Sequence, residues 1–382
     1  MTTPDHELVP DENLPEALPN VLRWDGPPTP ERLAGLPGVP AVLLLLDQHE
    51  RPVQLLTTQQ LKRLARSRLT GPDASSAPRA DLSAVVRGVR WRRIDCPLEG
   101  RWWYYRLARA LHPGDYRTRI AFGPAWFLWL DPRRPLAELR ATERIWTLPG
   151  DFVGPFPTQK ACRTALDGLI DLFELCRDPQ QVRRAPAGQR CSYADMGRCD
   201  APCDGSASLD AYAQRTRAAW NFAAGGVADW LQQAQARMRH AAADQRYERA
   251  ALLKSQIDFA RRWREHWADT VCTADRMNYA LVIPATRRKA CKLFVFRRGH
   301  LADGPLLPSG KLVAGAGPWI EEQLAQPPPE LDAQVRMEQT WLVAHFLQHK
   351  EARAAFVEHL PDERLPPDFE QRLGLARADR DS

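Results

Sequence analysis

Four cysteines lie within 28 residues near the middle of this 382-residue chain, and their spacing constrains the fold more than any other feature. Fourteen residues separate Cys176 from Cys191, seven separate Cys191 from Cys199, and three separate Cys199 from Cys203. Thiolates are soft ligands, and four of them can surround one zinc ion or one iron–sulfur cluster. The spacing leaves both open, although the absence of a C-x-x-C pair is less typical of a zinc ribbon.

The alternative interpretation of these cysteines is that they are buried and hold no ligand, as free cysteines often do. The segment is polar and contains Pro and Gly, which makes close packing less favourable there and favours a metal centre. The other four cysteines stand alone in the sequence, and for them we expect places in the core: Cys96, Cys162, Cys272 and Cys291.

The length predicts two or three domains. The basic charge is compatible with a polyanionic binding partner. Lys and Arg number 53 against 47 for Asp and Glu, and the sequence pI is near 9.0. The N-terminus is acidic and Pro-rich and lacks the regions of a signal peptide. The strongly apolar run at residues 41–46 is far shorter than the ~20 residues that span a bilayer. We therefore expect a cytoplasmic protein with no membrane role, where disulfides are disfavoured.

Hydrophobic periodicity predicts an α/β + α architecture in six segments. A disordered leader is expected at 1–36 and a flexible tail at 361–382. Between them we expect a small α/β domain at 37–148, a cysteine-cluster module at 149–207, a helical region at 208–268 and a small α/β module at 270–360. Individual elements are predicted as strands at 41–47, 53–56, 279–284 and 292–301, and as helices at 59–69, 101–111, 158–176, 208–235, 236–268 and 335–349.

The cysteine segment resembles the UvrC/Cho excinuclease family of nucleotide excision repair. The residues that carry this resemblance are Arg190-Cys191, Tyr193, Arg198-Cys199, Ala201-Pro202-Cys203 and Gly205, with Leu175-Cys176 placed as in the Cho branch. The resemblance implies a [4Fe–4S] cluster rather than zinc, held by Cys176, Cys191, Cys199 and Cys203.

Two flanking segments agree with this resemblance. Upstream, the stretch D-F-V-G-P-F-P at 151–157 is similar to a Gly-Pro-Phe-Pro stretch of the family. Downstream, residues 241–260 resemble the UVR motif, a helical hairpin that in the family pairs with UvrB. The pattern alone is that of an ordinary amphipathic helix, which more often packs than docks. The resemblance implies UvrB as a further partner, bound through Tyr247, Glu248, Leu252, Leu253 and Ile257.

The family's nuclease domain has the GIY-YIG fold, and the resemblance implies a degenerate copy of it at 37–148. Aligned on the first strand, the catalytic tyrosines, lysine, arginine and metal-binding glutamate are replaced by Leu43, Gln54, Thr57, Leu64 and Tyr104 or Tyr105. Arg63 or Arg66 could replace the arginine only after a register shift. Glu99 is kept, but a lone carboxylate is a weak magnesium site, so we interpret it as a solvated residue at a helix start. A divalent metal is expected only if the nuclease is active. The family's C-terminal RNase H-like nuclease is not expected here.

Two basic stretches favour DNA as a partner, because cationic side chains bind phosphates irrespective of sequence. Trp91 lies within the second stretch and could stack on an exposed base. The alternative for each stretch is an ordinary solvated face. The predicted DNA-binding residues are Lys62, Arg63, Arg66 and Arg68 in the first stretch and Arg90, Arg92 and Arg93 in the second.

The leading hypothesis is a UvrC/Cho-like protein that binds DNA and UvrB and lacks nuclease activity. One alternative is an active structure-specific endonuclease that uses displaced residues such as Glu99, Tyr104 and Arg63 around a divalent ion. A second alternative is an iron–sulfur redox sensor associated with DNA, in which the cluster itself is the working part.

Overall fold

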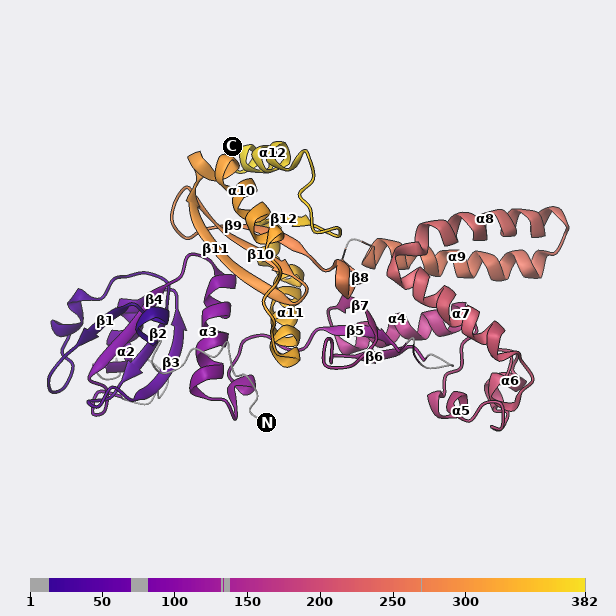
Figure 1. The fold of residues 1–382 in the computed structure, drawn as a ribbon, viewed down its shortest axis with the longest axis horizontal. Coiled ribbons are helices and arrows are strands. Elements are labelled where there is room, and N and C mark those ends of the chain that lie inside the picture. Colours follow the sequence, from indigo (N-terminus) through magenta and orange to yellow (C-terminus); the bar gives the residue numbers. More distant parts are fainter. Residues whose placement is uncertain (1–13, 70–81, 132, 134–137, 269, 382) are drawn as a thin grey trace.

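The computed structural model describes residues 14–69, 82–131, 133, 138–268 and 270–381. These residues form three antiparallel sheets of four strands each, together with helices that pack on them and a long helical hairpin (Figure 1). The expected combination of α/β and helical parts is therefore confirmed at that level. No helix among the described residues is both long and apolar enough to cross a membrane.

The N-terminal sheet has a fully buried strand at its centre. Strand β2 is apolar at all six positions and buried at each, because helices cover both of its faces. Val42 and Leu44 pack toward α3, whereas Leu43 and Leu45 pack toward α2. The strands run in the order β1 (Asn20–Arg23), β4 (Gly88–Arg93), β2 (Ala41–Leu46) and β3 (Pro52–Thr58), and the helices are α2 (Leu61–Leu69) and α3 (Pro97–Leu111).

The prediction of a disordered leader is wrong for residues 14–36, and residues 1–13 lie outside the described part. Helix α1 (Leu14–Ala17) and strand β1 are present, and β1 pairs with β4. Trp24, Leu33 and Leu36 are buried in the core beneath α2. The apolar residues here are too widely spaced among prolines to show a period, yet β4 offers them an open sheet edge.

The middle sheet joins segments on both sides of two predicted domain boundaries. Its order is β6-β5-β7-β8, and β5 and β6 had been expected in the N-terminal domain, while β8 lies beyond the helical region. Long-range pairing of this kind leaves no mark on local periodicity. The elements are β5 (Trp126–Leu130), β6 (Arg140–Thr142), β7 (Asp151–Phe156), β8 (Cys272–Thr273) and the following helix α4 (Gln159–Leu172), which the Thr158 hydroxyl caps.

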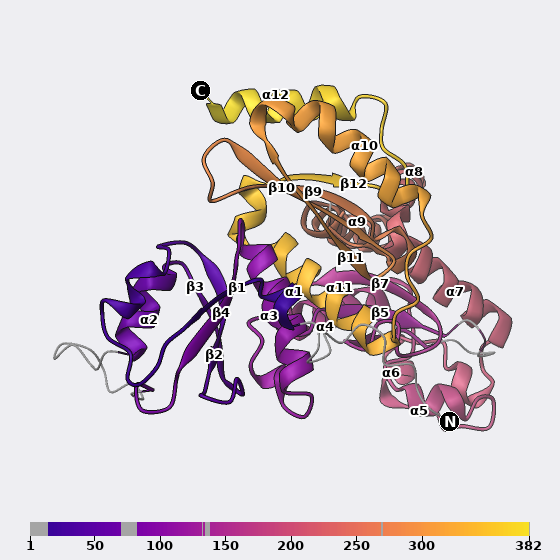
Figure 2. The same cartoon turned by 60° about the vertical axis from the view of Figure 1, so that its left-hand side comes forward.

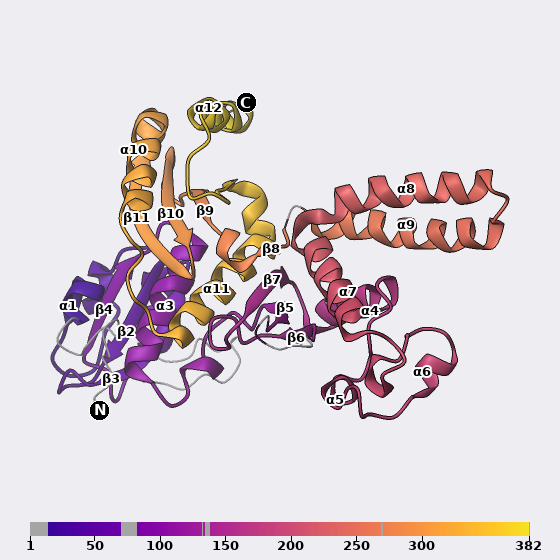
Figure 3. The same ribbon diagram turned by 45° about the vertical axis from the view of Figure 1, so that its right-hand side comes forward.

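The helical region is divided differently from the prediction. Helix α7 (Leu209–Asn221) is followed by a π turn in which Gly225 has a φ of 125°, and then by α8 (Val227–Ala243) and α9 (Tyr247–Trp267). The predicted break at 235/236 is wrong because a run of good helix formers continues through it. The chain turns instead at Gln245, whose φ is 56°. Helices α8 and α9 form a hairpin that projects from the rest of the molecule (Figure 3).

The C-terminal sheet lies between two helical layers (Figure 2). One face packs on α10 and α12, and the other packs on α11 and, beyond it, on α3 of the N-terminal part. The single strand predicted at 292–301 is two strands, because Arg298 and Gly299 turn the chain with φ of 49° and 84°. The order is β11 (His300–Pro308), β10 (Ala290–Arg297), β9 (Tyr279–Pro284) and β12 (Phe356–His359), and the helices are α10 (Leu312–Ala325), α11 (Ala333–Gln348) and α12 (Phe369–Asp381).

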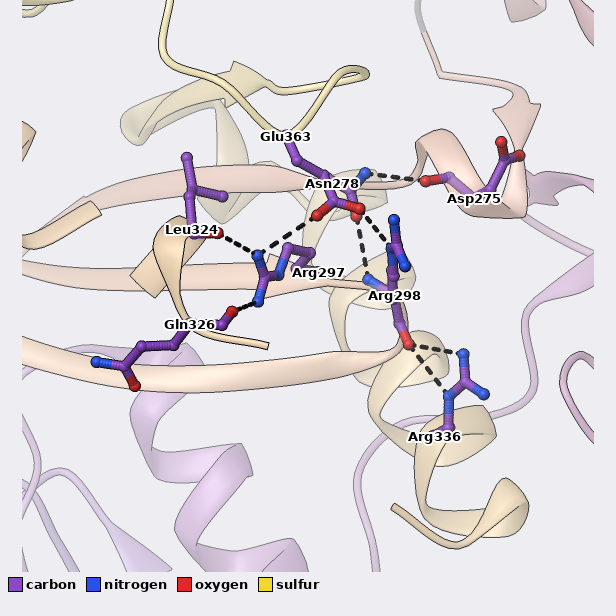
Figure 4. A network of polar contacts seen from close by, with 8 residues as sticks. All are labelled: Asp275, Asn278, Arg297, Arg298, Leu324, Gln326, Arg336 and Glu363. Carbon is purple, nitrogen blue, oxygen red and sulfur yellow. Dashed lines mark hydrogen bonds and ion pairs between the residues drawn. The ribbon is translucent and has the colours of Figure 1, made fainter. Parts of the chain in front are cut away.

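The segment predicted as a flexible tail is packed over its described part. Phe369 and Leu373 are each 2% exposed against the C-terminal sheet and α10. Glu363, just before α12, forms ion pairs with Arg297 and Arg298, and Arg297 also donates to the carbonyl of Leu324 at 2.6 Å (Figure 4). This network anchors the final segment, and it depends on charges 65 residues apart that local patterning cannot pair.

Candidate functional site

The four candidate ligands lie together in the loops that follow α4. Cys176 comes after the end of α4, Cys191 precedes the short helix α6 (Ser192–Asp195), and Cys203 lies in a 3₁₀ turn. The thiol of Cys176 donates to the carbonyl of Asp178 at 3.3 Å and lies next to Cys199, and Cys203 is close enough to Cys176, Cys199 and Cys191 for electrostatic interaction. We call these four residues the cysteine group. The fold thus brings together all four residues that the sequence singled out.

Hydrogen bonds hold the cysteine group in place. The backbone N–H of Cys176 donates to the Tyr212 hydroxyl on α7 at 3.3 Å, and Tyr212 is 3% exposed. The N–H of Gly188 donates to the carbonyl of Cys203 at 2.7 Å. A Cβ atom at Gly188 would lie 2.9 Å from that carbonyl oxygen, so only glycine fits there without a shift. The short helices α5 (Pro179–Arg183) and α6 lie near each other in this part of the chain (Figure 3).

The neighbouring Cys176 side chain, the backbone N–H of Ala201 and the charge of Arg215 together lower the pKa of the Cys199 thiol. Within the described residues, no set of three or more His, Cys, Asp or Glu side chains is arranged to hold a single metal ion. A [4Fe–4S] cluster is larger than an ion, and its four thiolates stand farther apart than the ligands of one ion.

Hydrogen-bond donors that have no partner lie beside the cysteine group and favour a bound anionic ligand. The Nε and Nη2 atoms of Arg215 are buried and have no hydrogen-bond partner among the described residues. Buried donors without partners are costly, and a thiolate-bound cluster carries negative charge and accepts hydrogen bonds at sulfur. The donor set and this guanidinium therefore fit such a cluster.

The positions aligned with the nuclease site are not brought together. Leu43 and Leu64 pack in the apolar core beneath α2, and Gln54 is half-buried on β3. Only Thr57 and Tyr104 line a common cleft, which has a volume of about 420 Å³. Tyr105, the other residue aligned with the metal ligand, is buried and donates to Glu338 at 2.9 Å. No carboxylate of the nuclease pattern faces this cleft.

The interpretation of Glu99 as a solvated helix-start residue is wrong. Its side chain is 4% exposed and accepts from the backbone N–H of Asp95 at 2.5 Å. Lys292 on β10 lies 3.3 Å from one carboxylate oxygen of Glu99 and 2.7 Å from Asp303 on β11. Burial raises the pKa of Glu99, and the ammonium of Lys292 opposes that shift. The carboxylate is thus enclosed between α3 and the C-terminal sheet.

The convergent cluster required by the endonuclease alternative is absent from the described residues. Tyr104 lines the 420 Å³ cleft, but neither Glu99 nor Arg63 does. Arg63 is exposed on α2, which covers the opposite face of the N-terminal sheet from α3. Arg101 in the cleft makes a two-point ion pair with Glu351, at 2.7 and 2.9 Å.

The basic residues predicted to bind DNA are divided among several roles. Arg92 donates to the carbonyls of Ala17 and Glu16 at 2.6 and 2.7 Å, and its guanidinium lies 3.9 Å from the Trp103 ring centroid. Lys62 donates to the carbonyl of Ala34 at 2.9 Å. These two cations therefore hold the N-terminal segment in place.

Strand alternation separates the remaining residues of the second basic stretch. Arg90 lies opposite Leu44 on the α3 face, whereas Arg93 lies opposite Ala41 on the α2 face and pairs with Asp95 at 3.6 Å. Trp91 packs against the core beneath α2 and is not an exposed stacking surface. On α2, Arg68 is half-buried, and the exposed cations of the predicted set are Arg63 and Arg66.

The residues predicted to contact a partner fall on both faces of α9. Leu253 and Ile257 are 3% and 2% exposed and pack inside the molecule. Tyr247 and Leu252 are 69% and 46% exposed near the turn of the hairpin, and Glu248 is exposed beside them. An exposed tyrosine and leucine at the end of a projecting hairpin are available for a docking contact.

Sequence reasoning missed two buried charged residues that join distant segments. Lys292 pairs with Glu99 and with Asp303, and Glu338 on α11 is 0% exposed and accepts from Tyr105, from Tyr116 at 2.7 Å and from Arg117 at 2.8 Å. The one local signal is a lysine at the start of the apolar run K-L-F-V-F, which gives no indication of its partners.

Comparison with known proteins supports the family resemblance of the cysteine segment. Residues 128–222 match the family of the UvrC/Cho excinuclease middle domain. A UvrABC system protein C from Thermus thermophilus is 35% identical over 130 residues, which is 33% of this chain and 21% of that protein. A second, from Shewanella halifaxensis, is 36% identical over 118 residues, covering 30% of this chain and 19% of the relative.

The similarity extends beyond the middle domain in some relatives. The UvrABC system protein C of Syntrophus aciditrophicus is 25% identical over 296 residues, covering 76% of this chain and 47% of that protein. The chain thus spans less than half the length of these curated relatives. No solved structure gives a significant match. Residues 128–222 are thus similar to the middle domain of the UvrC/Cho excinucleases, and a weaker similarity to UvrABC system protein C extends over 76% of the chain.

Proposed function

We propose that this chain is a DNA-repair protein of the UvrC/Cho kind that binds DNA, holds a [4Fe–4S] cluster and does not cut DNA. The absence of DNA cleavage is inferred mainly from the burial of Glu99 beside Lys292. A nuclease that hydrolyses phosphodiesters needs a carboxylate that can hold a divalent ion beside the substrate. Here Lys292 takes the place next to the carboxylate where an ion would bind.

Several features of the N-terminal part support a degenerate GIY-YIG-like domain. An antiparallel hairpin of β2 and β3 is followed by helix α2, the third strand β4 pairs with β2, and α3 follows. The cleft lined by Thr57 and Tyr104 lies where β3 faces α3. The domain would contribute a DNA-facing scaffold without catalytic groups.

The [4Fe–4S] cluster is proposed on Cys176, Cys191, Cys199 and Cys203. When bound, it would cross-link the loops between α4 and α7. It would also place negatively charged hydrogen-bond acceptors near the buried nitrogens of Arg215, which have no partner among the described residues. Such a cross-link stabilises a segment that contains only short helices. Its proposed role is therefore structural.

The hairpin of α8 and α9 is proposed as a UVR-like element that docks on UvrB. Tyr247 and Leu252 supply the exposed apolar contact, while Leu253 and Ile257 hold the hairpin together. This arrangement matches the general mode in which anchors on one helical face enter a groove of the partner.

An assay of the anaerobically purified chain on labelled duplex, bubble and lesion-bearing DNA, with magnesium or manganese, tests this function. The expected result is binding that weakens steeply with salt, without nicks. Nicks that disappear in Glu99→Gln or Tyr104→Phe would show an active endonuclease. A chain that binds none of these DNAs would remove DNA binding from the proposal.

A further inference from the structure

An apolar groove with a cationic rim lies between α4 and α9, at the base of the projecting hairpin. Its volume is about 570 Å³, and it lies apart from both the cysteine group and the cleft of the N-terminal domain. Three aromatic side chains of α9 line it: Phe259, Trp263 and Trp267. We call it the α4–α9 groove.

Packing fixes these aromatic rings before any ligand arrives. Trp267 meets Phe156 of β7 edge-on at 5.2 Å between ring centroids, and Trp263 lies 6.1 Å from Phe259. Phe259 in turn packs directly on Gly168 of α4, where a Cβ atom would lie 2.1 Å from the ring. Rigid aromatic faces of this kind lose little entropy when a flat molecule stacks on them.

The charges of the groove have one sign. Its lining includes Lys160, Arg262 and His266, and no carboxylate. Lys160 and Arg262 are exposed, and no acidic side chain of the described chain lies within ion-pair distance of either one. His266 uses Nδ1 in a contact with the carbonyl of Arg262 at 2.8 Å, which leaves Nε2 directed elsewhere. The groove therefore suits a ligand that combines a flat apolar face with negative charge.

Unpaired DNA has this combination, and duplex DNA does not. In a duplex the base faces are stacked on one another, whereas an unpaired strand presents base faces for stacking and phosphates for cations. A volume near 570 Å³ falls in the range of about 300–1,000 Å³ usual for small-molecule sites, so it admits a short stretch of nucleotides.

The geometry points to the α4–α9 groove as a binding site for unpaired DNA, with bases on Trp267 and Phe259 and phosphates on Lys160 and Arg262. The inference rests on the proposed DNA-binding function and adds a place and a preferred form of DNA to it. The site would bind one strand of a DNA duplex that has been opened near the base of the α8–α9 hairpin.

Fluorescence anisotropy with labelled oligo(dT) and a blunt duplex, on the full anaerobically purified chain, tests this site. The double variant Lys160→Gln/Arg262→Gln removes two phosphate contacts, and Trp267→Leu removes a stacking face while keeping an apolar side chain. Each is expected to weaken oligo(dT) binding about tenfold, with duplex binding unchanged. The slope of log affinity against log salt should fall by about 1.4 in the double variant, at about 0.7 per phosphate contact.

The matched control is Arg264→Gln, an exposed arginine on the same helix that does not line the groove. It is expected to leave oligo(dT) affinity within about twofold. Equal effects of the control and the double variant would overturn the assignment of the groove. A chain that binds duplex and not oligo(dT) would also overturn it, while leaving the proposed function in place. If the unaltered chain binds neither oligo(dT) nor duplex, both the groove assignment and the proposed DNA-binding function are wrong.

Discussion

Glu99 is buried and the cysteine group is partly buried, yet the polar atoms of these two places are satisfied in different ways. Glu99 receives a backbone N–H and the ammonium of Lys292 from within the chain. Beside the cysteine group, two nitrogens of Arg215 remain without a partner among the described residues. A buried group that the chain itself satisfies is part of the structure, whereas unsatisfied donors beside candidate thiolate ligands fit a bound anion.

Replacement of Lys292 is expected to give the largest loss of stability. Lys292→Met leaves Glu99 buried without its counter-ion, which should lower the free energy of unfolding by about 3 kcal/mol. Urea denaturation followed by circular dichroism measures this loss. Lys254→Met, at an exposed lysine of α9, should change it by less than about 0.5 kcal/mol.

The double variant Glu99→Gln/Lys292→Met should recover part of that loss, because the buried carboxylate that lacks a counter-ion is replaced by a neutral amide. If Lys292→Met were as stable as the unaltered chain and also gained manganese-dependent nicking, Glu99 would be a masked catalytic residue rather than a structural one.

The free energy of unfolding should also depend on pH, through His300 on β11 of the C-terminal sheet. Burial, together with the charges of Arg297 and Arg106, lowers the pKa of His300 from 6.5 to about 4. The unfolded chain then binds a proton below about pH 6.5 that the folded chain refuses until about pH 4, so stability falls as pH falls through this window. The loss should reach about 3 kcal/mol. His300→Gln should flatten the slope of unfolding free energy against pH, and an unchanged slope would contradict this assignment.

Arg215 should have a smaller effect on the fold and a specific one on the cluster. In iron-free protein its ion pairs with Asp200 and Glu174 join partly exposed side chains, so Arg215→Met should cost about 1 kcal/mol or less. In loaded protein the visible absorption should be lost about tenfold faster in air, as for other residues around metal centres. Arg217→Met, an exposed arginine of the same helix, serves as the control. Equal decay rates would remove Arg215 from the cluster's surroundings.

The smallest effect on stability is expected at the end of the hairpin. Tyr247 and Leu252 are exposed, so alanine at either position should change the unfolding free energy by less than about 0.5 kcal/mol. Capture of purified UvrB by the chain should nevertheless weaken, and Arg249→Ala in the same turn should leave it unchanged. Capture that is equal in all three variants would place the UvrB contact elsewhere.

Local patterns predicted local structure well. The buried run at 41–46, the amphipathic period of α2 and the apolar β9 each appear close to their predicted positions. The cysteine spacing identified four residues that the fold brings together. Their proximity depends on turns within one short segment, and such turns are encoded by nearby residues such as Gly188 and Gly205.

The remaining features depend on contacts between distant segments. Glu99 lies 193 positions before Lys292 in the sequence, and nothing near either residue indicates the other. Likewise, β1 forms only because β4 presents a free edge, and α12 is held partly because Glu363 reaches Arg297. The burial of a charged residue becomes visible only when its partner is placed, so the interpretation of Glu99 from sequence was wrong.

Quantitation of iron and acid-labile sulfide in the anaerobically purified chain tests the central claim most directly. The account predicts about four of each per chain, falling below about one in Cys199→Ser and unchanged in Cys162→Ala, a buried cysteine of α4 outside the group. One zinc per chain, or a Cys199→Ser variant that keeps its iron, would contradict it.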